Sequence, residues 1–318
     1  MNIRTILSVM KRLRVLVVGD ICLDRWCTYD PIYSEPSRET GLARTAVIRT
    51  EVTPGAGGTI ANNLRALGVE EVSVLGVIGD DGFGWELSRA LELRGVRPNL
   101  IVDNEISTFT YTKLLNSQTG AEDLGRVDFI NIDPPPQTAE SEMLRRLVVD
   151  DFDVVIACDQ AETPAGGVIT ESVRDRINGL AGAHSEKIFW VDSRIRIERF
   201  RNVVAKPNES EADAACKRLF ETIDYSRLRE HCHFPALIVT QADRGAQVIE
   251  PHGSSWVPTR KVPVRDICGA GDSFSAAAAC ALAVTRDPVI AAEFGNLAAS
   301  VTVQKPGTGV ATPDELLA

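Results

Sequence analysis

The segment with the clearest chemical content is "DICGAGDSF", residues 266–274, in which Gly269, Ala270, Gly271 and Asp272 precede a run of alanines. Amide N–H groups at a helix start have no partner within the helix, and the helix dipole adds partial positive charge there. Glycine lets a ligand approach the backbone without meeting a Cβ atom. We therefore expect the first three residues to form a cradle for an anion such as phosphate. An acid would repel a resting phosphate, so we interpret Asp272 as a base that takes the proton of an attacking hydroxyl group.

The same four residues also fit an ordinary helix start with no ligand. Acidic side chains favour helix N-termini, and glycine precedes helices in many turns. The motif alone therefore leaves two interpretations open, a phosphate site with a base or a plain structural turn. The choice between them depends on the rest of the chain.

Strands that alternate with helices must hold this helix start in place. Apolar, β-branched runs typical of strands buried on both faces occupy residues 14–20, 72–79, 153–157, 188–192, 202–206 and 236–240. Helical spacing is found at residues 83–95, 166–180, 270–285 and 288–303. This alternation predicts βαβ units and a mainly parallel sheet. The alanines at 276–279 would let the helix that follows Asp272 pack closely on that sheet.

A second, smaller sheet is predicted from a different pattern. Apolar and polar residues alternate at 45–52, 108–115 and 126–131. A period of two indicates strands with one face in water. We expect a small separate sheet within about residues 22–54 and 103–132, placed to cover a cleft as a lid. No long linker or internal repeat interrupts the chain, so we expect one domain over residues 1–318.

Composition excludes several classes of protein. The chain has 318 residues, of which 44% are hydrophobic and 25% charged, and its net charge is −10. This is ordinary globular composition, and the acidic balance argues against a nucleic-acid binder, which needs a basic face. No apolar run reaches the length of a membrane span, and the N-terminus lacks a signal-peptide core. We therefore expect a cytoplasmic protein with no membrane or nucleic-acid partner.

Cysteine and histidine usage indicates the same compartment and no metal cluster. The seven cysteines include no C-x-x-C pair, which indicates free thiols in a reducing environment. His231, Cys232 and His233 are consecutive, so their side chains point in different directions. We interpret them as a helix end or a loop rather than a metal site.

The motif at 266–272 resembles the D-x-x-G-A-G-D signature of the ribokinase-like PfkB carbohydrate kinases. Other segments resemble further family motifs in the family's order: "GDICLDRW" (19–26), "PGAGGTIANNLRALG" (54–68), "AKPNESEA" (205–212) and "VTQADRGAQV" (239–248). The resemblance covers about residues 13–315. Within the family, the chain looks most like the D-glycero-β-D-manno-heptose-7-phosphate kinase branch.

The resemblance implies a fold and an activity. The expected fold is a three-layer α/β/α sandwich with a mostly parallel central sheet and a small β-sheet lid. The expected activity is ATP-dependent transfer of the γ-phosphate to a hydroxyl group of a sugar or sugar phosphate, with Mg²⁺ and in a homodimer formed through the lid. Asp272 matches the catalytic base, and Gly269, Ala270 and Gly271 match the anion hole.

On the nucleotide side, five residues match family positions. Glu211 matches the acid that organises Mg²⁺ through water, and Asn208 supports the same region. Thr240 and Gly245 match nucleotide contacts, and Asn296 resembles a residue lining the adenine pocket. Asn208 and Glu211 also have the spacing of a capping box at a helix start, and the two roles are compatible. A plain β-turn explains Thr240 and Gly245 equally well.

On the sugar side, Asp24 matches the acid that binds sugar hydroxyl groups, since a carboxylate can accept two hydrogen bonds from a vicinal diol. Gly55, Gly57 and Gly58 match the glycine-rich signature and would let the backbone approach the ligand. Thr59 stands where the family usually has an asparagine that contacts the sugar.

Three further departures or ambiguities concern the same motifs. Ala56 and Ala242 each stand where the family has a glycine. Asp266 resembles a residue near the monovalent-cation site of several members.

Charged residues near the presumed cleft remain ambiguous. Lys113 and Arg126, on the presumed lid strands, would reach a phosphate already present on the substrate, or are ordinary surface cations. Arg194 and Asp159 follow strand ends, where α/β proteins place ligands, with the same two interpretations.

Alternative functions remain open at this point. The acceptor could instead be fructose 6-phosphate, ribose or a nucleoside, since Thr59 departs from the family. A second alternative is a regulatory protein that binds sugar or nucleotide and catalyses little. A Rossmann dehydrogenase is disfavoured because no G-x-G-x-x-G follows the first strand. The heptose branch often carries a fused nucleotidyltransferase, and from the end of the chain at "TPDELLA" we expect no such second activity.

Overall fold

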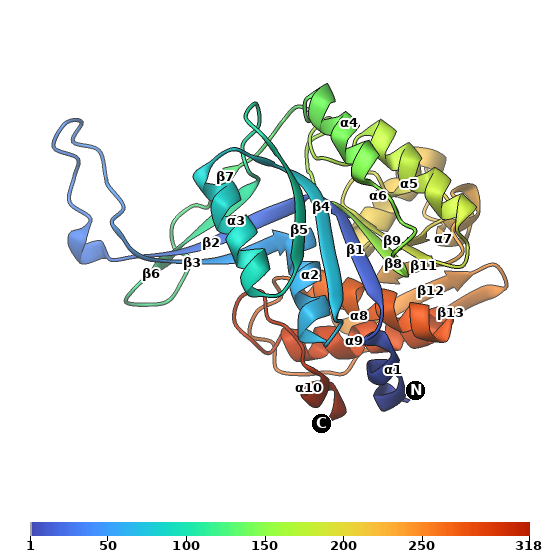
Figure 1. The fold of residues 1–318 in the computed structure, drawn as a ribbon. Helices are drawn as coiled ribbons and strands as arrows, with labels where there is room; N and C mark the ends of the chain where they lie inside the picture. Colours follow the sequence, from blue (N-terminus) through green and yellow to red (C-terminus); the bar gives the residue numbers. More distant parts are fainter. Residues whose placement is uncertain (1) are drawn as a thin grey trace.

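The computed structural model describes residues 2–318 and has a nine-stranded sheet at its centre (Figure 1). The strand order is β13-β12-β11-β10-β9-β8-β1-β4-β5, parallel except for the β11-β12-β13 end. The strands are β1 (Arg14–Gly19), β4 (Glu71–Gly79), β5 (Arg97–Asp103), β8 (Val154–Asp159), β9 (Ile188–Ser193), β10 (Val204–Ala205), β11 (Leu237–Thr240), β12 (Ala246–Glu250) and β13 (Gly253–Val257). The mainly parallel sheet predicted from the apolar runs is confirmed.

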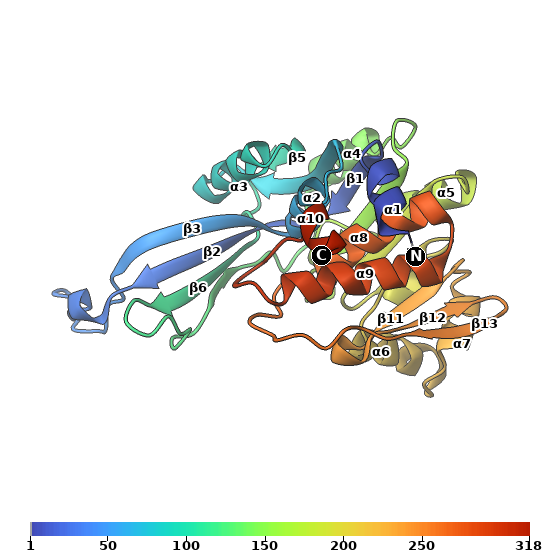
Figure 2. The same cartoon turned by 90° about the horizontal axis from the view of Figure 1, so that it is seen from below.

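Helices cover both faces of this sheet, which makes three layers (Figures 1 and 2). One face carries α1 (Ile3–Met10), α2 (Gly57–Ala66), α3 (Gly82–Leu93), α8 (Ala270–Thr285), α9 (Pro288–Thr302) and α10 (Pro313–Leu317). The other face carries α4 (Gln137–Arg146), α5 (Glu171–Ala183), α6 (Glu209–Phe220) and α7 (Tyr225–His231). The chain also contains three short 3₁₀ helices among residues 2–318, namely η1 (Pro31–Tyr33), η2 (Ile197–Arg199) and η3 (Ala242–Arg244).

The central strand β1 shows why the sequence builds this sandwich. Val15 and Val17 pack into the core under α8, whereas Leu16 and Val18 pack into the core on the opposite face. A parallel strand buried on both faces needs such a continuous apolar run. The alanines at 276–279 and at 281 in α8 are completely buried, so this helix lies close against the sheet as expected.

The small sheet has four strands in the order β3-β2-β6-β7 and extends away from the sandwich (Figure 2). Its strands are β2 (Ile21–Tyr29), β3 (Val47–Ala56), β6 (Thr110–Asn116) and β7 (Val127–Phe129). Three of them lie where the alternating residues predicted strands. The fourth, β2, was missed because Ile21, Cys22 and Leu23 are all buried, so the strand does not alternate at its start.

Two negative findings apply to residues 2–318. No helix there is long and apolar enough to cross a membrane. No group of three or more His, Cys, Asp or Glu side chains in that range is placed to hold a metal ion. Helix α7 ends at His231 with Cys232 as its C-cap, so the helix end expected at this position is confirmed.

Candidate active site

A cavity of about 160 Å³ lies where the small sheet meets the carboxyl ends of the parallel strands. Residues from four parts of the chain form its wall: Asp24, Lys113 and Arg126 from the small sheet, Ala56 and Thr59 beside the start of α2, Gln160 and Arg194 after β8 and β9, and Gly269 and Asp272 at the start of α8. The predicted sugar-binding carboxylate, Asp24, and the predicted base, Asp272, therefore line the same cavity.

The start of α8 has the backbone geometry of an anion cradle. Gly269 is the N-cap and has φ of 76°, a left-handed conformation that favours glycine. The N–H groups of Gly269 and Gly271 have no hydrogen-bond partner within residues 2–318. The Ala270 N–H differs from the expectation, because it donates to the Ile267 carbonyl at 3.2 Å. Two of the three predicted cradle amides are thus unpaired.

Asp272 is held in an environment that favours its protonated form. Burial and, next, the nearby Asp192 carboxylate raise the pKa of this carboxyl to about 8, against the opposing effect of Lys206. Its carboxylate accepts no hydrogen bond from the described residues 2–318. A carboxyl group with a pKa near neutrality that faces a cavity has the properties of a general base.

A buried ion pair lies behind the cradle, and the sequence reasoning missed it. The Lys206 Nζ atom is 2.8 Å from Asp192 Oδ2, and both side chains are almost fully buried. Ser275 donates to the same carboxylate at 3.1 Å. A Cβ atom on Gly271 would lie 3.5 Å from the Lys206 Nζ, so this charge lies next to the helix start. Both residues follow or end strands, a position that marks ligand sites in α/β folds and was the available signal.

Asn208 and Glu211 form the predicted capping box at the start of α6. The Asn208 side chain accepts from the Glu211 N–H at 2.9 Å, and Glu211 Oε2 accepts from the Asn208 N–H at 2.8 Å. Burial and the Asp192 carboxylate raise the pKa of Glu211, and Lys206 opposes them. Its second carboxylate oxygen is not used by the cap. An oxygen donor of this kind fits Mg²⁺, which retains waters and binds through one or two carboxylates and substrate phosphates.

Two of the remaining nucleotide-side residues, Gly245 and Asn296, meet at the end of β13, and Thr240 lies beside the start of α6. Gly245 has φ of 107°, and a Cβ atom there would lie 2.2 Å from the Val257 carbonyl oxygen. The Asn296 side chain donates to the same Val257 carbonyl at 3.1 Å. The Thr240 N–H donates to the Pro207 carbonyl at 3.0 Å, beside the start of α6. The structure therefore brings Gly245 and Asn296 to the same carbonyl group, and the Asn296 side-chain amide donates to the backbone.

Asp24 comes from β2 and faces the cavity without a hydrogen-bond donor among residues 2–318. Burial raises its pKa to about 6, although Lys113 and Arg126 oppose the increase. A Cβ atom on Gly55 would lie only 2.6 Å from Asp24 Oδ1. Gly55 is therefore required to make space for this carboxylate.

Gly57 and Gly58 make close packing contacts in the structure. A Cβ atom on Gly57 would lie 2.6 Å from Ile21 Cδ1, and one on Gly58 would lie 2.5 Å from Pro54 Cβ. These two glycines let the start of α2 pack on the strands. Thr59 lines the cavity, but its hydroxyl donates to the Pro54 carbonyl at 3.1 Å.

Ala56, which departs from the family motif, and Asp266, which matches it, both have defined places in the structure. Ala56 lines the cavity with φ of 50°, which is uncommon for alanine. Both oxygens of Asp266 accept backbone N–H groups, from Cys268 at 2.9 Å and from Gly307 at 3.0 Å. The Asp266 carboxylate thus fixes the loop before the cradle.

The cations of the small sheet line the cavity, with Lys113 partly buried and Arg126 exposed. Lys113 Nζ lies 3.8 Å from Glu122 and 4.6 Å from the centre of the Trp26 ring. Arg126 pairs with Asp128 at 2.7 Å. Both cations are therefore placed where they could contact a ligand in the cavity.

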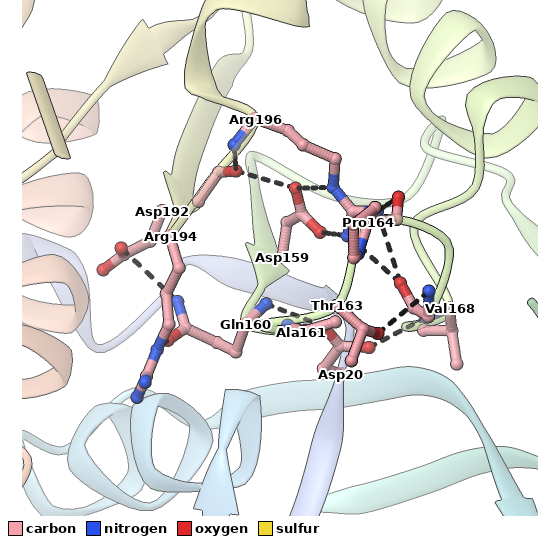
Figure 3. A network of polar contacts seen from close by, with 12 residues as sticks. Asp20, Asp159, Gln160, Ala161, Thr163, Pro164, Val168, Asp192, Arg194 and Arg196 are labelled. Carbon is pink, nitrogen blue, oxygen red and sulfur yellow. Dashed lines mark hydrogen bonds and ion pairs between the residues drawn. The ribbon is translucent and has the colours of Figure 1, made fainter. Parts of the chain in front are cut away.

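Two buried acids shape the loop after β8 (Figure 3). Asp20 accepts the N–H groups of Gln160 at 2.7 Å, Ala161 at 3.0 Å and Val168 at 2.8 Å. Asp159 forms a fully buried ion pair with Arg196. Asp159 is therefore a structural acid, and the loop that it fixes carries Gln160 to the cavity wall.

Comparison with known proteins identifies the family. Residues 196–315 match the pfkB family of carbohydrate kinases. The chain is 30% identical over 317 residues to the D-beta-D-heptose 7-phosphate kinase of Bordetella bronchiseptica, covering 96% of this chain and 95% of that protein. It is 30% identical over 325 residues to the bifunctional protein HldE of Rhodopseudomonas palustris, covering 98% of this chain and 64% of that protein. The chain belongs to the pfkB family of carbohydrate kinases.

Solved structures show the same fold. Phosphofructokinase-2 from Escherichia coli in complex with potassium has a TM-score of 0.74 at 18% identity, over 96% of this chain and 97% of that one. Ribokinase from Thermotoga maritima has a TM-score of 0.71 at 22% identity, over 96% of this chain and 98% of that one. The predicted ribokinase-like sandwich with a small accessory sheet is confirmed.

Proposed function

We propose that this protein is an ATP-dependent kinase that transfers the γ-phosphate to a hydroxyl group of a sugar phosphate. The observation that carries the proposal is the placement of two partly buried carboxyl groups, Asp24 and Asp272, in one cavity beside the unpaired amides at the start of α8. Asp24 would hold the sugar hydroxyls, and Asp272 would take the proton of the attacking one. The amides would stabilise charge that grows on the phosphoryl oxygens.

The nucleotide would lie across the ends of β10 and β11, with Asn208, Thr240 and Gly245 near it. Mg²⁺, when bound, would supply positive charge that offsets the negative charge of the ATP phosphates. Glu211 would hold it through water, using the carboxylate oxygen that the capping box leaves free. The small sheet would act as a lid that excludes water and limits ATP hydrolysis.

The acceptor class follows from the cations on the lid. Lys113 and Arg126 face the same cavity as Asp24, and phosphate is an anion that both side chains bind readily. Similarity to the D-beta-D-heptose 7-phosphate kinase of Bordetella bronchiseptica supports a heptose phosphate as the first acceptor to test. Thr59, in place of an amide side chain, makes other sugars a necessary part of the same test.

An acceptor screen tests the proposal. ATP, Mg²⁺ and the wild-type protein are combined with heptose 7-phosphate, fructose 6-phosphate, fructose, ribose or a nucleoside, and acceptor-dependent ADP formation is measured. We expect the highest kcat/KM for a phosphorylated sugar. If ligands bind but ADP never depends on an acceptor, the protein is a binding protein and the proposal is wrong.

Two further properties belong to this proposal. We infer a homodimer formed through the small sheet, whose strands β3 and β7 expose Val47, Ile48, Val127 and Phe129. Sedimentation of the wild type and Phe129→Asp measures it, with dimer loss expected in the variant. We also infer a cytoplasmic protein, which the seven free cysteines support.

A further inference from the structure

Arg194 has a place in the site that the proposed roles leave unused. It follows β9 and lines the same cavity as Gly269 and Asp272. Its Nε atom donates to Gln160 Oε1 at 2.9 Å, and its Nη1 atom pairs with Glu162. The Nη2 atom has no hydrogen-bond partner within residues 2–318. One edge of the guanidinium is therefore anchored, and the other is available to a ligand.

The anchor connects Arg194 through Gln160 to Asp192, the acid of the ion pair behind the cradle (Figure 3). Gln160 Nε2 donates to Asp192 Oδ1 at 3.4 Å, and Asp192 holds Lys206. Gln160 is buried, and its backbone is fixed by Asp20. The guanidinium is consequently positioned from the interior, and Glu162 is its partner on the solvent side.

The charges around Arg194 are those of a phosphoryl-transfer centre. Burial disfavours the charged guanidinium, but Tyr111 and the carboxylates of Glu162, Glu211 and Asp272 outweigh burial and raise its pKa. Arg194 is therefore near enough to the proposed base and to the proposed metal-organising acid to interact with the charges of both. Lys113 and Arg126 have their own acidic partners on the lid, at Glu122 and Asp128.

We propose that Arg194 is a catalytic residue that binds the phosphoryl group during its transfer, exchanging Glu162 for two phosphoryl oxygens. This inference rests on the proposed function. In the reaction, an oxygen–phosphorus bond to the acceptor forms and the bond from the γ-phosphorus to the bridging oxygen breaks. ADP leaves with that electron pair, the hydroxyl proton goes to Asp272, and Arg194 keeps its charge. A planar guanidinium matches phosphoryl oxygens with two parallel N–H groups.

The first test compares Arg194→Met with a matched control. Arg218 also pairs with a glutamate, Glu198, and its side chain is 42% exposed against 43% for Arg194. We expect Arg194→Met to lower kcat about 10²-fold with both KM values nearly unchanged, the size of effect for losing one preorganised donor. Arg218→Met should keep kcat. Guanidinium chloride at tens of millimolar should restore part of kcat to Arg194→Ala, whereas sodium chloride should not.

Glu162→Gln separates catalysis from simple structural pairing. The proposal expects this variant to keep kcat within about threefold, because Glu162 only holds Arg194 before the phosphoryl group arrives. Equal losses in Arg194→Met and Glu162→Gln would show that the ion pair is structural and would overturn the proposal. A rise confined to the acceptor KM in Arg194→Met would also overturn it.

Failure of the proposed function can be told apart from failure of this inference. ADP with Mg²⁺ and aluminium fluoride mimics the phosphoryl group in transfer and needs no turnover. We expect the wild type to bind this complex about tenfold or more tightly than Arg194→Met does, with ADP alone bound equally. If the wild type phosphorylates no acceptor, this difference still decides the role of Arg194, and equal binding rejects it.

Discussion

The Lys206 ammonium lies 2.8 Å from the Asp192 carboxylate, directly behind the start of α8. Each side chain is less than 10% exposed, so neither charge is hydrated in the usual way. Asp192 raises the pKa of Asp272 and Lys206 lowers it. The pair therefore sets the charge balance around the proposed base.

Replacing Lys206 by methionine tests this balance. The variant leaves Asp192 buried without its cation, so we expect the pKa of Asp272 to rise above about 8. The pH at which kcat/KM reaches its plateau should move upward. The free energy of unfolding should fall by about 3–5 kcal/mol, the usual effect of removing one partner of a buried pair. The double variant Lys206→Met with Asp192→Asn should recover much of that loss in urea titrations, and a plateau pH unchanged in Lys206→Met would contradict this account.

The dependence of activity on pH follows from two raised pKa values. Asp24 has a pKa of about 6 and Asp272 a pKa of about 8. Each must be ionised, Asp24 to accept sugar hydroxyls and Asp272 to accept the proton. We expect kcat/KM to fall about tenfold per pH unit below pH 8 and more steeply below pH 6.

Asp24→Asn is the control for the steeper fall in kcat/KM that we expect below pH 6. It should have lower kcat/KM at every pH but should lose the additional steepness below pH 6. Measuring both proteins with the same acceptor removes the contribution of the acceptor's own phosphate ionisation. Identical profile shapes for the two proteins would show that Asp24 does not titrate in this range.

Gly55→Ala tests whether the position of the Asp24 carboxylate determines sugar binding. The new Cβ atom would lie 2.6 Å from Asp24 Oδ1, so the Asp24 carboxylate must move. We expect the acceptor KM to rise about tenfold, equivalent to about 1.4 kcal/mol, with the ATP KM unchanged. Gly179→Ala serves as control, since nothing lies within 4 Å of the built Cβ atom there. An unchanged acceptor KM in Gly55→Ala would place the sugar elsewhere.

Glu211→Gln separates the helix cap from the proposed metal role. Glutamine at this position can still accept from the Asn208 N–H, so the thermal midpoint of unfolding should change little. The charge is lost, so the Mg²⁺ concentration needed for half-maximal activity should rise about tenfold. A lowered thermal midpoint with an unchanged Mg²⁺ requirement would assign Glu211 to the cap alone.

Most of the features that could be predicted from the sequence depend on residues that are close to one another along the chain. The capping box of Asn208 and Glu211 involves residues three apart, and the start of α8 is set by consecutive residues, so both are legible in the sequence. The apolar run of β1 reports burial on both faces in the same local way.

Contacts between segments that are distant in the sequence could not be predicted from such local patterns. Asp192 and Lys206 are ordinary strand-end residues until the parallel strands β9 and β10 place them side by side. Gly57 and Gly58 fit a ligand-approach role by type, but Ile21 and Pro54 occupy the space that their Cβ atoms would need. The strand β2 was hidden because its first residues are buried on both faces, against the sandwich.

The turnover of Asp272→Asn tests the central claim most directly. With ATP, Mg²⁺ and the best acceptor at saturation, kcat should fall about 10²–10⁴-fold, the usual contribution of a general base. ATP binding measured by calorimetry should stay within about threefold, because asparagine keeps the size of the side chain. A variant that retains more than a tenth of the wild-type kcat would contradict the assignment of Asp272 as the base.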